Sequence, residues 1–171
     1  NLMFSTELGS VAGDAATIYR IGGALVGVTI CEDIWSPVGP VSAQARAGAS
    51  LAVSINASPF HRGRLDERTA MIAERAKSTG CAVAYVNQMS GQDELVFDGG
   101  SMLVDDKGHV LARAPQFEEH LLFASVELPD AQPSASATVG RSGTAAKRLV
   151  VVTASPRRRP ALMCGAPLNV A

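Results

Sequence analysis

The chain has 171 residues, of which 47% are hydrophobic and 18% charged, and its net charge is −1. This composition can build one sizeable core and excludes a wholly disordered chain. Three widely spaced cysteines without a C-x-x-C pair argue against a disulfide framework or a zinc site, and no apolar stretch reaches the roughly 18 residues of a membrane span. We therefore expect a protein of the reducing cytoplasm, without a metal and without a membrane partner.

Short apolar runs alternate with helical stretches in residues 1–130, which predicts an α/β domain. The pair Gly22 and Gly23 is suited to a tight hairpin turn. Asp66 is expected to cap the main helix, Gly80 to end it, and Cys81 to lie in the core. Strands are expected at 17–21, 24–30, 51–55, 81–87, 101–104, 109–113 and 121–126, and helices at 41–48 and 66–79.

A cysteine follows the unbroken apolar run 24–30, which is typical of a strand buried on both faces. Cys31 would then lie at the carboxyl end of the strand, where ligands commonly bind in α/β sheets. Free cysteines are usually small core residues, and the adjacent Glu32 and Asp33 would raise a thiol pKa. A catalytic Cys31 therefore needs a cation or a base from elsewhere.

Two polar segments are expected to be loops on the same scaffold. The segment 56–64 follows the next strand, and a parallel arrangement would place Ser58 and Arg64 near Cys31, as a hydroxyl and a guanidinium fork suited to a carboxylate. A simple turn with solvated arginines is the other interpretation. The segment 87–101 is too long and too polar for a plain connection, which favours a functional loop.

The charge is unevenly distributed along the chain. Residues 1–130 carry 9 basic and 16 acidic groups, whereas residues 131–171 carry 6 basic and no acidic ones, giving −7 against +6. The second segment is rich in Ala, Pro, Ser and Arg. We expect it to be a low-complexity basic tail, either disordered or translated from a shifted reading frame. Its Arg157–Arg159 cluster lacks interleaved aromatics, so no nucleic-acid partner is expected.

Sequence blocks in residues 11–130 resemble the glutamine-hydrolysing amidase domain of glutamine-dependent NAD synthetases, within the nitrilase or carbon–nitrogen hydrolase superfamily. The blocks agree in order and spacing, and the third and fourth indicate the NAD synthetase branch. They are 31–35 (CEDIW), 56–60 (NASPF), 91–99 (GQDELVFDG) and 114–117 (APQF). The resemblance implies an α-β-β-α sandwich, of which this chain would hold an incomplete part.

The resemblance also implies roles for individual residues. Cys31 would attack the side-chain amide of glutamine, and water would hydrolyse the resulting glutamyl thioester. Ser58 and Arg64 match positions that hold the glutamine, and we add the hypothesis that Glu32 binds its ammonium group. The amidase domain needs no cofactor, since ATP and magnesium belong to the synthetase domain. The expected partners are glutamine, that synthetase domain and, in the full-length protein, further copies.

The chain departs from the family pattern at both ends. The family triad is Glu, Lys and Cys, with both partners upstream of the cysteine, but only Glu7 and no lysine precede Cys31. No glycine-rich phosphate loop of the synthetase half follows residue 130. We therefore expect a fragment without useful amidase activity, because losing one oxyanion donor alone can cost a factor on the order of 100–1,000 in rate.

Three alternatives stay open. The chain could be another nitrilase-superfamily amidase acting on a different amide or nitrile, although the block at 91–99 argues against this. It could be a catalytically silent domain kept for assembly. A papain-like pair would need His61, His109 or His120 beside Cys31.

Overall fold

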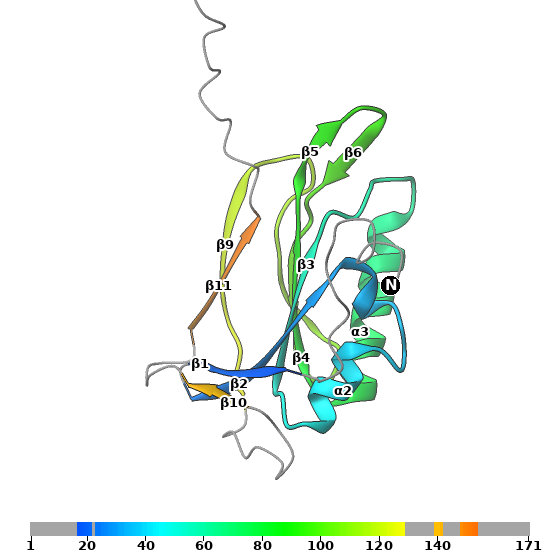
Figure 1. Cartoon of the computed structure of the whole chain (residues 1–171). Coiled ribbons are helices and arrows are strands. Elements are labelled where there is room, and N and C mark those ends of the chain that lie inside the picture. The colour runs from blue at the N-terminus through cyan, green and yellow to red at the C-terminus, as the bar shows by residue number, and fades with distance from the viewer. Residues whose placement is uncertain (1–16, 22, 129–138, 142–147, 154–171) are drawn as a thin grey trace, which may run out of the picture.

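The computed structural model describes residues 17–21, 23–128, 139–141 and 148–153. Its main sheet has the order β10-β1-β2-β3-β4-β7-β8, and β2, β3 and β4 run parallel at its centre (Figure 1). The strands are β1 (Ile18–Ile21), β2 (Ala24–Ile30), β3 (Leu51–Asn56), β4 (Ala82–Asn87), β7 (Met102–Val104), β8 (Val110–Arg113) and β10 (Val139–Arg141). The expected strands are therefore confirmed to within one or two residues.

Two hairpins lie in this sheet, and the first is the one expected at the pair Gly22 and Gly23. β1 and β2 pair antiparallel with Ile21 opposite Ala24, and Gly23 adopts a φ of 83° that favours glycine. β7 and β8 also pair antiparallel, and the Gly108 N–H donates to the Asp105 carbonyl in the turn between them. These short hairpins flank the parallel centre of the sheet.

Helices cover one face of the sheet: η1 (Cys31–Ile34), α2 (Pro40–Arg46) and α3 (Arg64–Thr79) (Figure 1). Ile72 and Ala76 of α3 are buried in the core on this side. Gly80 ends α3 with a φ of 64°, as expected, but the expected cap at Asp66 is wrong. Gly63 occupies the N-cap position, so the helix starts earlier and Asp66 lies in its first turn, where a carboxylate favours the helix dipole.

A second layer covers the other face of the sheet. β9 (His120–Ser125) pairs antiparallel with β11 (Arg148–Thr153), and Leu122 packs in a second core with Val26 and Leu103 (Figure 1). The helical layer, the main sheet and the β9–β11 pair confirm the α/β class and match three layers of the expected α-β-β-α sandwich (Figure 1). Strands β10 and β11 come from the segment expected to be a tail, and the remainder of that segment lies outside the described residues. The boundary at residue 130 stays a prediction.

Two expectations from the sequence, one for β2 and one for the segment 87–101, were wrong. β2 is not buried on both faces throughout, since Val28 is 39% and Ile30 67% exposed. The second core includes Ala24 and Val26 but does not reach these residues near the end of the strand. The polar segment 87–101 was expected to be a functional loop, but it forms a hairpin of β5 (Met89–Gln92) and β6 (Leu95–Asp98).

The hairpin turns at Asp93, which has a left-handed φ of 51°, a conformation that Asp tolerates better than most residues. Its polar residues obscured the alternation by which strands are recognised. Among the described residues, no helix is long and apolar enough to cross a membrane.

Candidate active site

Cys31 lies at the junction between β2 and η1, in an unusual backbone conformation. Its φ is 48°, in the left-handed region that few residues other than glycine occupy. The Ile30 N–H donates to the Asp33 carboxylate at 3.0 Å and so closes the turn around the cysteine. The thiol residue is half-buried. A strained, partly accessible cysteine at the end of a central parallel strand indicates a functional position.

Strand β2, which leads to Cys31, packs closely against α2. Gln44 donates from Nε2 to the Val28 carbonyl at 2.9 Å. A Cβ atom added at Gly27 would lie only 2.3 Å from Gln44 Oε1. Glycine at position 27 therefore lets the Gln44 side chain approach β2 closely. Together with the hydrogen bond to Val28, this contact holds the strand in place.

The turn after Cys31 is fixed from the other side by α3. Arg75 donates from Nε to the Ile34 carbonyl at 2.9 Å and from Nη2 to the Trp35 carbonyl at 3.1 Å. Burial lowers the pKa of this guanidinium. Trp35 in turn lies beneath Arg64, whose guanidinium carbon is 4.3 Å from the centre of the indole ring. Trp35, which directly follows η1, thus orients Arg64, the first residue of α3.

The loop after β3 opens at the same edge as Cys31, as expected for parallel strands. The Ser58 N–H donates to Asn87 Oδ1 at 2.9 Å, and Arg64 Nε donates to Ser58 Oγ at 3.4 Å. Arg64 also contacts Glu67 at 3.3 Å, an exposed pair of small energetic value. Ser58 is buried and Arg64 half-buried, whereas Glu32 is exposed.

Several groups act on the Cys31 thiol. Burial is the largest cause and raises its pKa above the ordinary value, and the Glu32 carboxylate raises it further. Backbone hydrogen bonds from Ala57 and Glu32 lower the pKa, and Arg64 lowers it least. The sequence predicted that neighbouring carboxylates would raise the pKa of the Cys31 thiol, and this is confirmed for Glu32. The Ala57 and Glu32 amides and Arg64 offer only partial compensation, so the pKa of the thiol stays raised.

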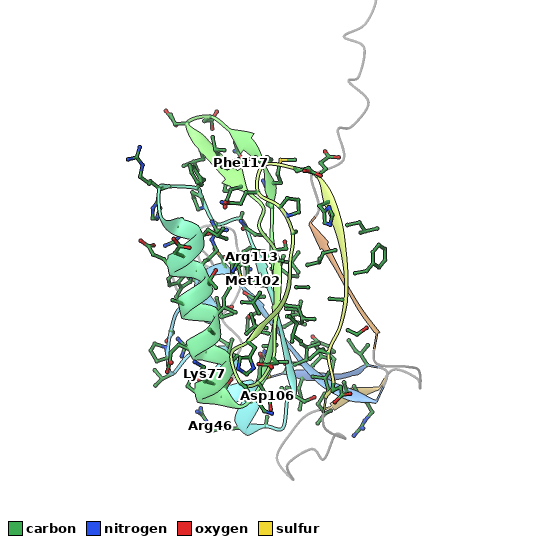
Figure 2. The ribbon with its side chains drawn as sticks, turned by 180° about the vertical axis from the view of Figure 1, so that it is seen from behind. Arg46, Lys77, Met102, Asp106, Arg113 and Phe117 are labelled. Carbon is green, nitrogen blue, oxygen red and sulfur yellow. The ribbon has the colours of Figure 1, made fainter. Side chains whose placement is uncertain are left out.

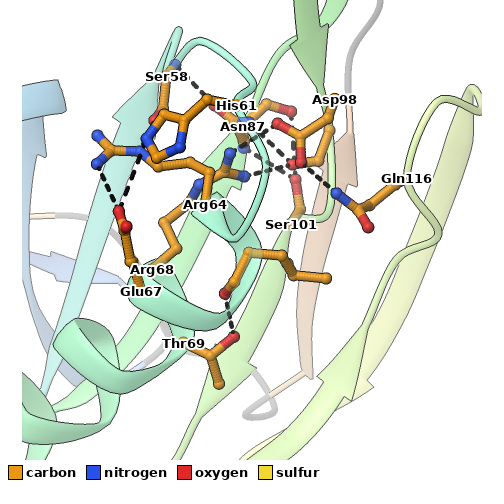
Figure 3. Close-up of polar contacts among 12 residues, drawn as sticks. Ser58, His61, Arg64, Glu67, Arg68, Thr69, Asn87, Asp98, Ser101 and Gln116 are labelled. Atoms are coloured by element: carbon orange, nitrogen blue, oxygen red, sulfur yellow. Dashed lines mark hydrogen bonds and ion pairs between the residues drawn. The ribbon is translucent and has the colours of Figure 1, made fainter.

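A buried polar network supports the site from below (Figure 3). Arg68 Nη2 donates to Asp98 Oδ1 at 2.7 Å, with both side chains fully buried, and Gln116 Nε2 donates to Asp98 Oδ2 at 2.6 Å. Gly99 O accepts from Arg68 and from Asn87 Nδ2. Since Asn87 also accepts from Ser58, the network joins α3, β4 and the base of the β5–β6 hairpin to the loop beside Cys31.

Sequence reasoning missed these supporting residues. Arg68 and Arg75 share the buried face of α3 with Ile72, and charged residues at core positions of a helix require buried partners. This pattern in the sequence could have indicated the supporting residues. Of the histidines, His61 pairs with Glu67 and His109 with Asp105, which gives no support to a papain-like pair.

Both lysines in the described part of the chain lie far from Cys31. Figure 2 shows Lys77 and Asp106 toward one end of the molecule and Phe117 at the opposite end. Phe117 packs against Phe60 of the Ser58 loop, with ring centres 5.0 Å apart, so the Phe117 end carries the candidate site. Within the described residues no cluster of His, Cys, Asp and Glu could hold a metal ion.

Comparison with known proteins agrees with this geometry. Residues 2–135 match the carbon–nitrogen hydrolase family model. The chain is 41% identical over 120 residues to a glutamine-dependent NAD(+) synthetase of Aquifex aeolicus and 42% identical over 119 residues to that of Thermotoga maritima. These alignments cover 70% and 69% of this chain but only 21% of each relative, so the chain spans about a fifth of their length.

Solved structures give the same picture. The glutamine-dependent NAD+ synthetase of Acinetobacter baumannii, in complex with ADP, superposes with a TM-score of 0.66 at 31% identity, covering 77% of this chain and 26% of that one. An amidase from Nesterenkonia sp. superposes with a TM-score of 0.55 at 26% identity, covering 72% of this chain and 44% of that one.

Proposed function

Because the chain belongs to the carbon–nitrogen hydrolase family, we propose that its site is built for glutamine hydrolysis, with Cys31 as the nucleophile. The thiol sulfur attacks the side-chain amide carbon, the C–N bond breaks, and the NH2 group leaves as ammonia by taking up the thiol proton. Water then adds to the glutamyl thioester and releases glutamate and the free thiol. The observation that carries this proposal is the strained, half-buried Cys31 at the parallel strand end, with hydrogen bonds from the Ala57 and Glu32 amides.

Glutamine recognition is assigned to the charged groups around the thiol. Arg64 presents a planar guanidinium, stacked on Trp35 and bonded to Ser58, which suits the α-carboxylate of an amino acid. Glu32 is exposed beside Cys31, where its carboxylate suits the α-ammonium group. Glutamine dependence in the names of the similar synthetases supports this choice of substrate.

Among the described residues, no base and no oxyanion cation lie at this site. Lys77 and Lys107 lie in or against the β7–β8 turn, far from Cys31, and the raised pKa of Cys31 leaves the thiol protonated. We propose that residues outside the described part supply both functions. The described residues alone should have little amidase activity, because oxyanion stabilisation is usually the largest catalytic contribution.

The ammonia needs an acceptor. By analogy with the similar synthetases, we propose that it amidates nicotinic acid adenine dinucleotide on an ATP- and magnesium-dependent synthetase domain, in a homo-oligomeric protein. A reducing compartment such as the cytoplasm would keep Cys31 as a free thiol.

Labelling by a chloroketone analogue of glutamine tests this function without requiring turnover. Intact-mass measurement should find one adduct at Cys31, formed more slowly in excess glutamine, and none in Cys31→Ala. A chloroketone that lacks the α-carboxylate should react more slowly. Equal rates for both reagents, with no protection by glutamine, would exclude glutamine recognition.

A second candidate is hydrolysis of a simpler amide, which the similarity to the Nesterenkonia amidase favours. The same labelling experiment separates the two functions. An amidase for simple amides should react equally with both chloroketones, and Arg64→Ala should change its two labelling rates by the same factor.

A further inference from the structure

Tyr85 of β4 has a fully buried side chain on the helix-covered side of the sheet. Within the described residues its hydroxyl makes no hydrogen bond of ordinary geometry, and Ser58 is the side chain that approaches it as a partner. Leaving a buried hydroxyl unpaired is costly, so an orphaned phenol of this kind needs a reason.

The phenol lies directly beneath the candidate site. Burial raises the Tyr85 pKa to about 12, while Arg68, the Ser58 side chain and Arg64 lower it, and the Cys31 thiol raises it. The hydroxyl is therefore close to both polar groups assigned to the glutamine carboxylate. Ser58 is itself only 2% exposed, and its hydroxyl accepts a hydrogen bond from Arg64 Nε.

We propose that Tyr85 is a positioning residue, whose hydroxyl donates to Ser58 Oγ and thereby orients Ser58 and Arg64 toward an α-carboxylate. A serine hydroxyl has two acceptor lone pairs and one proton. Arg64 Nε already donates to one lone pair at 3.4 Å, and Tyr85 would donate to the other. The Ser58 proton is then left for an acceptor that approaches beside Arg64. This inference rests on the proposed glutamine site.

A merely structural role makes a different prediction. Tyr85→Phe keeps the ring that fills the core and removes only an unpaired hydroxyl, so ligand binding would not change. Replacing an unsatisfied buried polar group by an apolar one can even stabilise a protein. Ligand affinity therefore separates the two roles, provided that the variant folds like the original chain.

The chain offers its own probe and its own control. Trp35 is the only tryptophan and lies 4.3 Å from Arg64, so its fluorescence reports on that guanidinium. Tyr19 is the other tyrosine and is 44% exposed on β1, so Tyr19→Phe controls for loss of a phenol elsewhere. Glutamine and 4-aminobutanamide, which lacks only the α-carboxylate, are titrated against all three proteins.

Tyr85→Phe should bind glutamine roughly threefold to tenfold more weakly, the worth of one hydrogen bond. Its affinity for 4-aminobutanamide should match that of the original chain, and Tyr19→Phe should match it for both ligands. Unchanged glutamine affinity in Tyr85→Phe, or an equal loss for both ligands, would overturn the positioning role.

The ligand-free emission spectrum distinguishes the failure of this inference from the failure of the proposed function. If the original chain binds no glutamine, the proposed function fails. A Trp35 emission change in Tyr85→Phe, absent from Tyr19→Phe, would still support the Tyr85–Ser58–Arg64 chain. Emission identical in all three proteins would overturn it.

Discussion

Arg64 and Trp35 form a stacked pair, with the guanidinium carbon 4.3 Å from the centre of the indole ring. The pair joins the start of α3 to the turn that follows Cys31. A cation over an aromatic face gains about 0.5–1 kcal/mol at exposed sites, and stacking also fixes the plane of the guanidinium fork. The surrounding residues therefore fix the orientation of the Arg64 guanidinium and have less effect on its charge.

Arg64→Lys should weaken glutamine binding by roughly tenfold to a hundredfold, because an ammonium keeps the charge but loses the bidentate fork and the stack. Titration followed by Trp35 fluorescence measures this change. Arg62→Lys, an exposed neighbour in the same loop, is the matched control and should bind normally. Normal glutamine affinity in Arg64→Lys would contradict the assigned role.

Glu32→Gln should weaken glutamine binding by about twofold to fivefold, since an exposed ion pair contributes little. Glutaramate has the same amide and carboxylate but no ammonium group, so its affinity should not change. Isothermal titration with both ligands tests this. Unchanged affinity for glutamine would remove Glu32 from the binding site.

The Cys31 thiol should react slowly with iodoacetamide at pH 7, and its rate should still be rising above pH 9. Its pKa is raised above 9.0, chiefly by burial, and only the thiolate reacts. Glu32→Gln should lower this pKa and Arg64→Ala should raise it. Cys81 is buried with a pKa of about 12 and should stay unlabelled in the native state.

These rates are measured in a Cys164→Ser background, with Cys31→Ala as the blank. A titration midpoint below the ordinary cysteine value would mean that a further cation acts on the thiol. A pKa shift of opposite sign in either variant would contradict the electrostatic assignment.

Asp98→Asn should lower the free energy of unfolding by about 3–5 kcal/mol, because it leaves the fully buried Arg68 charge without its partner. Asp93→Asn is the control, since Asp93 lies in the exposed hairpin turn and Asn tolerates its left-handed conformation. Urea unfolding measures both variants. A loss below 1 kcal/mol in Asp98→Asn would mean that water enters the network.

The sequence predicted Cys31, Ser58 and Arg64 as neighbours for a general reason. Parallel strands open their carboxyl-end loops on one edge, and the register of β2 with β3 places those loops together. The local order of residues therefore sufficed to predict this part of the site.

The supporting residues depend on contacts between distant segments and could not be found in the same way. Arg68 meets Asp98, which lies 30 residues further along the chain, and Arg75 meets Ile34, 41 residues earlier. Helical spacing showed that both arginines share the face of Ile72, but not which carboxylate or carbonyl would accept from them. The start of α3 was misplaced because Asp66 is a good cap by type, whereas Gly63 has the required turn geometry.

Ammonia release from glutamine is the most direct measurement of the central claim. Three proteins are compared: the chain, the chain joined at its N-terminus to the corresponding upstream segment of the Thermotoga maritima relative, and that joined protein with Cys31→Ala. The expected result is ammonia release by the joined protein alone. Release by the unmodified chain would show that its base and cation lie within these 171 residues. No release above the Cys31→Ala level in the joined protein, if it folds, would contradict glutamine hydrolysis at Cys31.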